Sequence, residues 1–198
     1  MLDKSVPYAG FYMQRAAGTP IASYPLPDGF VIAFYSDGDE ASWARIETSV
    51  LEFDSEFAAL MHFNENFMPY ADELRRRCFF IETSDGVKIA TATAWWQDID
   101  GKRRPWLHWV AVDPQFQGLG LGKALISRAL ELMIELEGDV DIYLHTQTWS
   151  YKAIGIYKSN SFKPTNEKIL YKNRKNNYRK AMRILAKLEP KLLTGSDP

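Results

Sequence analysis

A glycine-rich turn is the feature of this sequence whose residue types point most directly to chemistry. The segment QGLGLGK at 117–123 follows the apolar run WLHWVAV at 106–112 and opens an apolar-periodic stretch that extends to about Glu137. Glycine tolerates positive φ and lets a ligand approach the backbone, so successive N–H groups can point at a phosphate at the positive end of the following helix. The turn therefore predicts a phosphate-binding loop with Lys123 nearby, and a tight strand-to-helix turn that only needs flexible residues is the alternative.

Two familiar phosphate loops do not fit this turn. A Walker A loop fails because Gln117 and Ala124 stand where glycine and Ser or Thr are needed. The dinucleotide pattern G-x-G-x-x-G fails because its third glycine would fall on Lys123 or on Leu125. The pattern that remains is Q-x-x-G-x-G, made by Gln117, Gly120 and Gly122.

The elements that must position this loop alternate along the chain. Aromatic and β-branched runs predict strands at 8–17, 29–35, 79–82, 87–96, 106–112, 141–146 and near 168–171. Apolar residues at helical spacing predict helices over 43–53, 55–67, 120–137, 150–160 and 175–191, with a break at Pro69 and a short segment to Arg77. The order β-β-α-α-β-β-β-α-β-α-β-α predicts one α/β domain with a mixed sheet.

Two blocks of this sequence match one family. The segment LHWVAVDPQFQGLGLGKALISRALELM resembles the acetyl-CoA-binding core of the GNAT (Gcn5-related) N-acetyltransferases, whose pattern is V-x-P followed by [QR]-x-x-G-x-[GA]. The matching residues are Val112, Pro114, Gln117, Gly120 and Gly122. A second block, IYLHTQTWSYKAIGIYKSNSF, resembles the family's unit ending A-x-x-x-Y-x-x-x-[GS]-F, on Ala153, Tyr157 and Phe162. The chain departs from many members at Ser150, where they have Asn, and at Ser161, where they have Gly; both touch the turn around the second helix and leave the loop intact.

The resemblance implies a fold and a domain organisation. It covers roughly residues 29–171 and implies the GNAT (acyl-CoA N-acyltransferase) fold, a mixed central sheet flanked by helices, with an extra C-terminal helix. Residues 1–28 are expected to form an N-terminal strand and extension packed on this core, 29–171 the acetyltransferase domain, and 172–198 a basic C-terminal helix and tail.

The resemblance also implies a place for acetyl-CoA as cosubstrate. The molecule would lie in a V-shaped opening between strands 106–112 and 141–146, with its pantetheine paired to the backbone of Val110, Ala111 and Val112. A bulge, common in that strand in the family, would turn an N–H toward the thioester carbonyl and stabilise oxyanion charge. The pyrophosphate would meet the N–H groups of the loop formed by Gln117, Gly118, Leu119, Gly120, Leu121, Gly122 and Lys123.

Acetyl transfer to an amine requires two proton movements. Near pH 7 an alkylamine is mostly protonated, so a group must accept its proton, and the departing CoA thiolate benefits from a donor. Tyr157 matches the family's usual tyrosine acid in the second helix; the alternative is an aromatic residue that packs on the core with Phe162.

His108 is the first candidate for the proton acceptor. It lies four residues before Val112, and L-H-x-x-A-V resembles the arylalkylamine N-acetyltransferases, which have a functional histidine there. The alternative is a core histidine that is hydrogen-bonded across the sheet. Strict alternation puts His108 on the same face as Trp106, Val110 and Val112, unless a bulge changes the parity.

His145, at the end of the opposing strand, is the second candidate, followed by Glu82 and Asp113. Asp113 also fits a strand-end or turn residue beside Pro114, and His62, on an amphipathic helix, is interpreted as a surface or packing residue. Three histidines and the single cysteine, without ligand spacing, predict no metal site.

The acceptor amine stays open between a small molecule and a peptide N-terminus or lysine. Five of the six tryptophans surround the site in sequence, at positions 95, 96, 106, 109 and 149. Adjacent strand residues face opposite sides, so we expect one or two of them to wall an acceptor site and favour an apolar or aromatic amine. The acidic body would also attract a cationic amine, weakly and with salt screening.

Composition and charge bound the remaining possibilities. The chain has 198 residues with 46% hydrophobic and 25% charged residues, which is typical of one globular domain. One cysteine, Cys78, allows no internal disulfide, and neither a secretory h-region nor a membrane-spanning run is present, so we expect a cytoplasmic protein with no membrane partner. Residues 163–198 hold ten Lys or Arg and three Asp or Glu, a net +7, which leaves −8 on residues 1–162.

The basic end has three interpretations. A terminal helix docked on the acidic body is the first, with Tyr178, Met182, Leu185 and Leu192 near one stripe. A homodimer contact is the second, and an RNA- or ribosome-facing patch is the third, since charge without an RNA-binding motif does not predict a nucleic-acid partner. The function expected from the whole sequence is a GNAT N-acetyltransferase that acts by direct transfer in a ternary complex. The alternative is a catalytically silent acyl-CoA-binding or interaction module whose basic tail binds RNA or another partner.

Overall fold

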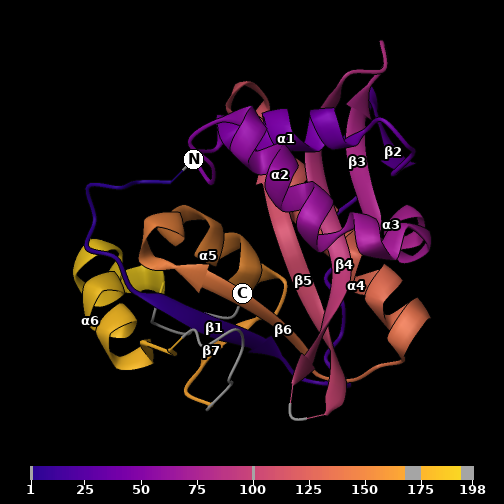
Figure 1. The fold of residues 1–198 in the computed structure, drawn as a ribbon. Coiled ribbons are helices and arrows are strands. Elements are labelled where there is room, and N and C mark those ends of the chain that lie inside the picture. The colour runs from indigo at the N-terminus through magenta and orange to yellow at the C-terminus, as the bar shows by residue number, and fades with distance from the viewer. Residues whose placement is uncertain (1, 100, 168–174, 193–198) are drawn as a thin grey trace.

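The computed structural model describes residues 2–99, 101–167 and 175–192, and its elements follow the expected order (Figure 1). The strands are β1 (Gly10–Arg15), β2 (Phe30–Phe34), β3 (Cys78–Thr83), β4 (Lys88–Ile99), β5 (Lys102–Val112), β6 (Ile142–Gln147) and β7 (Lys163–Thr165). The α-helices are α1 (Glu40–Ser49), α2 (Glu56–Asn66), α3 (Ala71–Arg77), α4 (Leu121–Glu137), α5 (Tyr151–Ser159) and α6 (Tyr178–Leu188). Short 3-10 turns are η1 (Met68–Tyr70), η2 (Pro114–Phe116), η3 (Thr148–Ser150) and η4 (Pro190–Leu192).

Local signals explain where the helices of the N-terminal half begin and end. The Ala58 N–H donates to Ser55 Oγ at 3.2 Å, so Ser55 caps α2 as expected. Pro69 lies in η1, which separates α2 from the short helix α3. The strand expected near 168–171 lies outside the described residues, and the described strand of this region is β7.

The strands form one seven-stranded sheet in the order β2-β3-β4-β5-β6-β1-β7. Neighbouring strands are antiparallel except β5 and β6, which run parallel, so the predicted mixed sheet is confirmed. Among the described residues, β5 and β6 pair only at Trp106 and Tyr143. The remaining residues of the two strands therefore leave an opening in the middle of the sheet.

Helices cover both faces of the sheet. In Figure 1, α1 and α2 lie in front of β3–β5, whereas α4 passes behind the sheet. The core on the α4 side includes Leu125, Leu130 and Phe79, all fully buried, and it continues to α5 and α6 through Ile154 and Leu185. The second core, under α1, α2 and α3, is built mainly of aromatic rings around Trp43, Phe63, Phe67 and Phe80. The sheet that contains the opening between β5 and β6 thus has a separate hydrophobic core on each of its faces.

A β-bulge in β5 is the local irregularity that matters most for the opening. Thr91 pairs with Ala111 and Thr93 pairs with His108, so three steps on β5 oppose two on β4. Trp109, inside the bulge, has φ 46°, a left-handed conformation that costs a non-glycine residue about 1–2 kcal/mol. The bulge reverses the side-chain parity: Val110 and Val112 pack toward α4 with Leu107, whereas Ala111 packs under α1 and α2. The strict alternation that would put His108 on the face of Val112 is therefore wrong.

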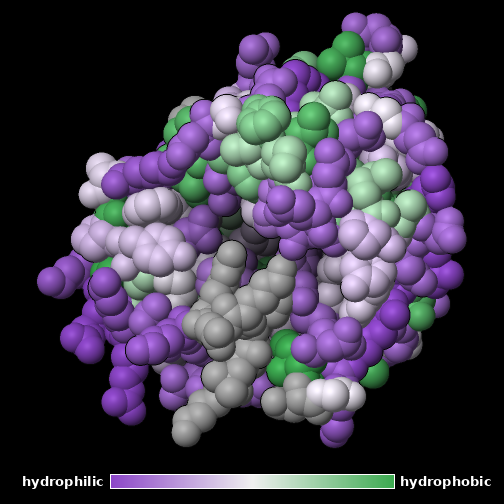
Figure 2. Space-filling view, viewed as in Figure 1, coloured by the Kyte–Doolittle hydropathy of each residue, from purple (hydrophilic) through white to green (hydrophobic). Residues whose placement is uncertain are grey.

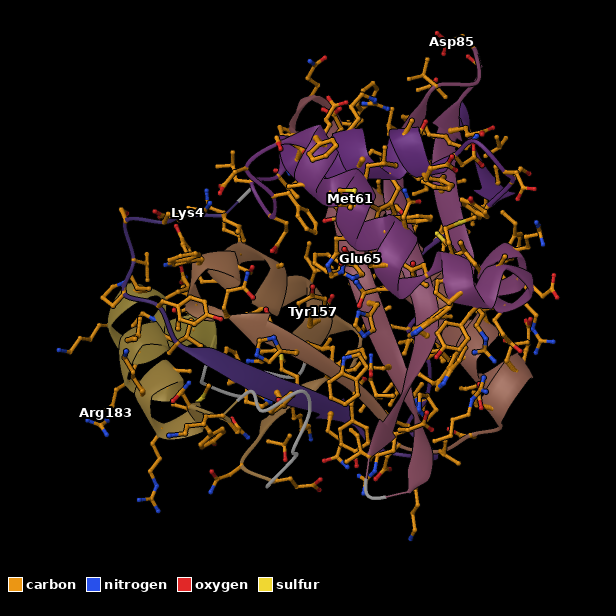
Figure 3. All side chains as sticks on the ribbon, in the orientation of Figure 1. Lys4, Met61, Glu65, Asp85, Tyr157 and Arg183 are labelled. Carbon is orange, nitrogen blue, oxygen red and sulfur yellow. The ribbon has the colours of Figure 1, made fainter. Side chains whose placement is uncertain are left out.

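The C-terminal helix α6 docks through its apolar face. Ala181 and Leu185 are fully buried, and the Asn177 N–H donates to the Gly10 carbonyl at 3.0 Å, beside β1. The cations of α6 face solvent, as Arg183 does in Figure 3, and within the described chain no α6 side chain forms an ion pair. The basic end thus folds onto the body by apolar contact rather than by charge pairing.

Candidate active site

Two cavities meet at the opening between β5 and β6. The loop cavity, about 540 Å³, lies between the C-terminal end of β5, the glycine-rich turn and α5. The tryptophan cavity, about 370 Å³, lies between α1, α2, β5 and β6 and is lined by Trp95, Trp96, Trp106 and Trp109. Both cavities share Glu52, Val110, Ser150 and Tyr157. Figure 2 shows this face of the molecule hollowed at its centre, below the α1 and α2 layer.

The loop cavity is built by residues that the sequence pattern singled out. Every predicted cofactor-binding residue lines it except Leu119, whose side chain is 51% exposed: Val110, Ala111, Val112, Gln117, Gly118, Gly120, Leu121, Gly122 and Lys123. The Gln117 side chain does not point into open space, because its Nε2 donates to the Val112 carbonyl at 2.9 Å. Gln117 therefore ties the loop to the end of β5.

The glycines of the loop serve different purposes. Gly118 and Gly120 have φ of 87° and 84°, and a Cβ added to either would meet no protein atom within 4 Å. Gly120 is the residue before α4, and its carbonyl accepts from the N–H groups of Lys123 and Ala124 at 3.0 and 3.3 Å. The N–H groups of Leu121 and Gly122, which line the cavity, have no acceptor inside the helix. Gly122 is helical, and a Cβ there would lie 3.3 Å from Ile156 Cδ1 on α5. The first two glycines shape the loop, and the third lets α4 and α5 approach.

The walls of the tryptophan cavity differ from the sequence expectation of one or two tryptophans. Trp95 and Trp96 stack with ring centroids 4.3 Å apart, and both line the cavity although they are adjacent in β4. The pairing of β4 with β5 is regular at both residues, in the part of the two strands that Figure 1 shows extending as a ribbon, so the side chains rather than a bulge bring the two rings together. Trp149 does not line the cavity; its Nε1 donates to the Val6 carbonyl at 2.6 Å.

Tyr157 lies where the two cavities join. It projects from α5 and lines both of them, and its ring also meets Phe162 edge-on at 6.3 Å. Figure 3 shows Tyr157 and Glu65 of α2 on opposite sides of the central opening. Burial, followed by the carboxylates of Glu52 and Glu47, raises the pKa of the Tyr157 phenol. The phenol therefore stays protonated at neutral pH.

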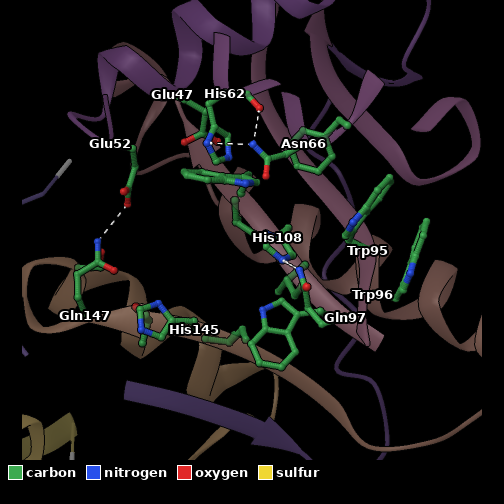
Figure 4. A pocket seen from close by; sticks show the side chains of 18 of the residues that line it. Glu47, Glu52, His62, Asn66, Trp95, Trp96, Gln97, His108, His145 and Gln147 are labelled. Atoms are coloured by element: carbon green, nitrogen blue, oxygen red, sulfur yellow. Dashed lines mark hydrogen bonds between the residues drawn. The ribbon is translucent and has the colours of Figure 1, made fainter. Parts of the chain in front are cut away.

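Both histidine candidates line the tryptophan cavity (Figure 4). His108 Nε2 lies 2.7 Å from Gln97 Nε2 on β4, so a Gln97 amide N–H that donates to Nε2 would leave the proton of a neutral ring on Nδ1. His145 packs against Tyr12 at 5.1 Å, and its approach requires Gly10, where a Cβ would lie 2.8 Å from His145 Nε2. The fold thus brings His108, His145 and Tyr157 to one opening.

Two acids of the cavity were not predicted from the sequence. Glu47 is 1% exposed and Glu52 borders both cavities, where its Oε1 accepts from Gln147 Nε2 at 3.2 Å. Burial, followed by the Glu52 carboxylate, raises the pKa of Glu47 well above its usual range. The available signal was spacing: Glu47 lies four residues after Trp43, on the apolar stripe of the predicted helix.

The remaining acid candidates lie elsewhere. Glu82 pairs with Lys88 at 2.6 Å, and Asp113 accepts from the Gln115 N–H at 3.0 Å while pairing with Arg45. Neither lines either cavity, so both are wrong as proton acceptors, while the turn interpretation of Asp113 is confirmed. His62 packs against Trp109 at 5.0 Å, as a packing interpretation expects, but it also faces the tryptophan cavity (Figure 4).

Within ranges 2–99, 101–167 and 175–192, no helix is long and apolar enough to cross a membrane. In the same ranges no three His, Cys, Asp or Glu side chains are grouped as a metal ion would need.

Comparisons with known proteins address the fold and the family. Residues 39–162 match the model described as the acetyltransferase (GNAT) family. An uncharacterized protein of Mycobacterium leprae (strain TN) is 25% identical over 162 residues, which are 79% of this chain and 40% of that protein. The chain thus spans about two fifths of that relative's length.

Solved structures share the architecture at low identity. A GCN5-related N-acetyltransferase from Sphaerobacter thermophilus superposes with a TM-score of 0.63 at 18% identity, over 81% of this chain and 49% of that one. A GNAT-family acetyltransferase from Colwellia psychrerythraea gives a TM-score of 0.58 at 12% identity, over 80% of this chain and 54% of that one. The chain spans about half the length of both, and at these identities the likeness concerns the fold.

Proposed function

The chain belongs to the GNAT acetyltransferase family, and on that premise we propose that it transfers the acetyl group of acetyl-CoA to a primary amine by direct attack in a ternary complex. The observation that carries the proposal is the junction of the two cavities at Tyr157. One cavity has a glycine loop at a helix N-terminus, and the other has three histidines, among them the candidates His108 and His145. The site therefore offers an anion cradle on one side of the Tyr157 phenol and proton acceptors on the other.

The loop cavity suits an acyl-CoA. The space beyond Gly118 and Gly120 is open, and the first-turn N–H groups of α4 and the Lys123 ammonium suit a pyrophosphate. The backbone of Val110, Ala111 and Val112 borders the unpaired side of β5 and would hold the pantetheine amides as an added strand would. Bound there, acetyl-CoA supplies the activated acyl carbon.

The chain's own residues would move the protons. With the Gln97 amide turned so that its Oε1 accepts from His108 Nε2–H, the acceptor nitrogen of the neutral ring is Nδ1. His108 would accept a proton there from the amine, whose nitrogen forms a bond to the acyl carbon while the carbon–sulfur bond breaks. An N–H freed at the β5 bulge would donate to the carbonyl oxygen as it gains negative charge. Tyr157 would donate its proton to the departing sulfur and recover one from solvent, and His145 is the second candidate for the acceptor role.

A free-thiol assay with acetyl-CoA and a panel of amines tests the proposal. We expect CoA release with at least one amine class and a lower kcat in Tyr157→Phe, by roughly tenfold or more, with nearly unchanged acetyl-CoA affinity. If the protein binds acetyl-CoA but releases no CoA with any amine, the proposed enzymatic function is refuted, and the catalytically silent acyl-CoA-binding module is the function that remains. Full activity in Tyr157→Phe would remove Tyr157 from the mechanism.

A further inference from the structure

The Glu47 carboxyl is buried, and one of its two oxygens has no hydrogen-bond donor among the described residues. The residue is 1% exposed, and within the described chain its Oε1 has no hydrogen-bond donor. A buried acceptor without a donor costs free energy, so native structures keep one only where something compensates. Glu47 stands in the wall of the tryptophan cavity, where a bound molecule can bring the missing donor.

The charged groups of the tryptophan cavity are of one sign. Its acidic lining residues are Glu47, Glu52, Glu65 and Asp98, and no Lys or Arg is among the described residues that line it. The other titratable rings that line it belong to three histidines and two tyrosines: His62, His108, His145, Tyr70 and Tyr157. A ligand with an ammonium group is attracted into such a space, whereas a carboxylate or phosphate is repelled.

The rest of the wall is aromatic. Trp109 stacks on Phe53 at 5.2 Å and meets Trp43 edge-on at 5.5 Å, so the bulge in β5 holds its indole against the α1 and α2 layer. Phe67 and Trp95 continue the wall with ring centroids 5.1 Å apart. Such rings bury the apolar body of a ligand and attract a cation over their faces. A volume of about 370 Å³ is in the range of small-molecule sites.

We propose that the tryptophan cavity binds a small cationic amine that has an apolar body and no acid group, and that Glu47 is the side chain that holds its ammonium. The role of this amine as acetyl acceptor rests on the proposed acetyltransferase function. The preference of the cavity for such an amine does not depend on that function. Glu47 and Glu52 both act electrostatically on Tyr157, so an ammonium held there lies beside the junction of the cavities.

Binding can be measured without turnover. The probes are phenethylamine against phenylalanine, and isoamylamine against leucine, because each pair differs by one carboxylate and keeps the apolar body. Quenching of tryptophan fluorescence reports occupancy, since four tryptophans line the cavity. We expect each amine to bind at least roughly tenfold more tightly than its amino acid, the scale of one charged contact.

Two variants of Glu47 and one matched control test the assignment to this residue. A bound ammonium favours the ionised form of the Glu47 carboxyl. Glu47→Gln has nearly equal volume but cannot ionise, so it should weaken amine binding roughly ten- to hundredfold, whereas Glu47→Asp can still ionise and keeps the preference for the amine. Glu56→Gln removes one exposed acid of α2 that lines neither cavity, and it should leave binding unchanged. A thermal melt of each variant shows that it is folded.

Several results would overturn the inference. Phenylalanine or leucine binding as tightly as its amine would do so, as would a folded Glu47→Gln with unchanged affinity, or binding of lysine peptides alone. Amine binding that depends on Glu47 without any acetyl transfer would uphold the inference and refute the proposed function. Acetyl transfer that occurs only to amines bearing an acid group would uphold the proposed function and refute this inference.

Discussion

At the scale of single residues, Glu47 connects the stability of the fold with its site. Burial, followed by the Glu52 carboxylate, raises the pKa of Glu47 well above its ordinary value of 4.5, so the ionised form is disfavoured in the folded state. The stability that protonated Glu47 contributes is therefore fully present below about pH 4.5 and is lost as pH rises through the pKa of the folded state. The loss is about 1.4 kcal/mol for each pH unit that separates the folded pKa from the unfolded one. Glu47→Gln should match the wild type near pH 4 and be more stable at pH 8. Urea unfolding at both pH values measures this, and a difference that does not change with pH would contradict it.

Some residues of the site could be predicted from the sequence, and others could not. The loop residues and Tyr157 were predicted from motif spacing, and all but Leu119 line the expected cavity. Glu47 was missed because a carboxylate on an apolar helical stripe has no local signature; only the packing of α1 over β5 decides what it faces. Glu82 and Asp113 were misjudged because their ion pairs, to Lys88 and Arg45, join segments whose contact is set by the fold.

At the scale of elements, the two glycines of the motif, Gly120 and Gly122, should respond differently to substitution by alanine. Gly120→Ala places a Cβ on a backbone with φ 84°, which costs about 1–2 kcal/mol and should distort the loop, so acetyl-CoA affinity falls roughly tenfold or more. Gly122→Ala adds a Cβ only 3.3 Å from the flexible end of Ile156 in a regular helix, so we expect a change of about threefold or less. Isothermal titration with acetyl-CoA separates the two, and equal losses would contradict these separate roles.

Most of the helices and strands were predictable, whereas two features of β4 and β5 were not. Periodicity and turn residues indicated the helices and strands, including the caps at Ser55 and the break at Pro69. The face on which each β5 residue lies was not predictable, because one extra residue at Trp109 reverses the parity. The stacking of Trp95 on Trp96 was not predictable either, because strand alternation assigns adjacent residues to opposite faces.

At the scale of the whole molecule, the C-terminal helix α6 docks on the body through the apolar stripe that its sequence indicated, while its cations face solvent. Leu185→Ala should lower the free energy of unfolding by about 2–5 kcal/mol, because Leu185 is fully buried against the body. Arg183→Glu, on the exposed face of the same helix, should change it by no more than about 0.5 kcal/mol. Chemical denaturation gives both values. If Arg183→Glu lowered the free energy of unfolding more than Leu185→Ala does, charge pairing rather than apolar contact would hold α6 on the body.

The central claim is that one opening joins an acyl-CoA site to an amine site at Tyr157. The most direct measurement is a single-turnover reaction of the full chain with acetyl-CoA and phenethylamine, in which free CoA and acetylated amine are quantified together by mass spectrometry. The account predicts that both products appear in equal amounts in the wild type and far more slowly in Tyr157→Phe. Acetyl-CoA that binds to the protein and is recovered intact, or CoA that is released without acetylated amine, would contradict it.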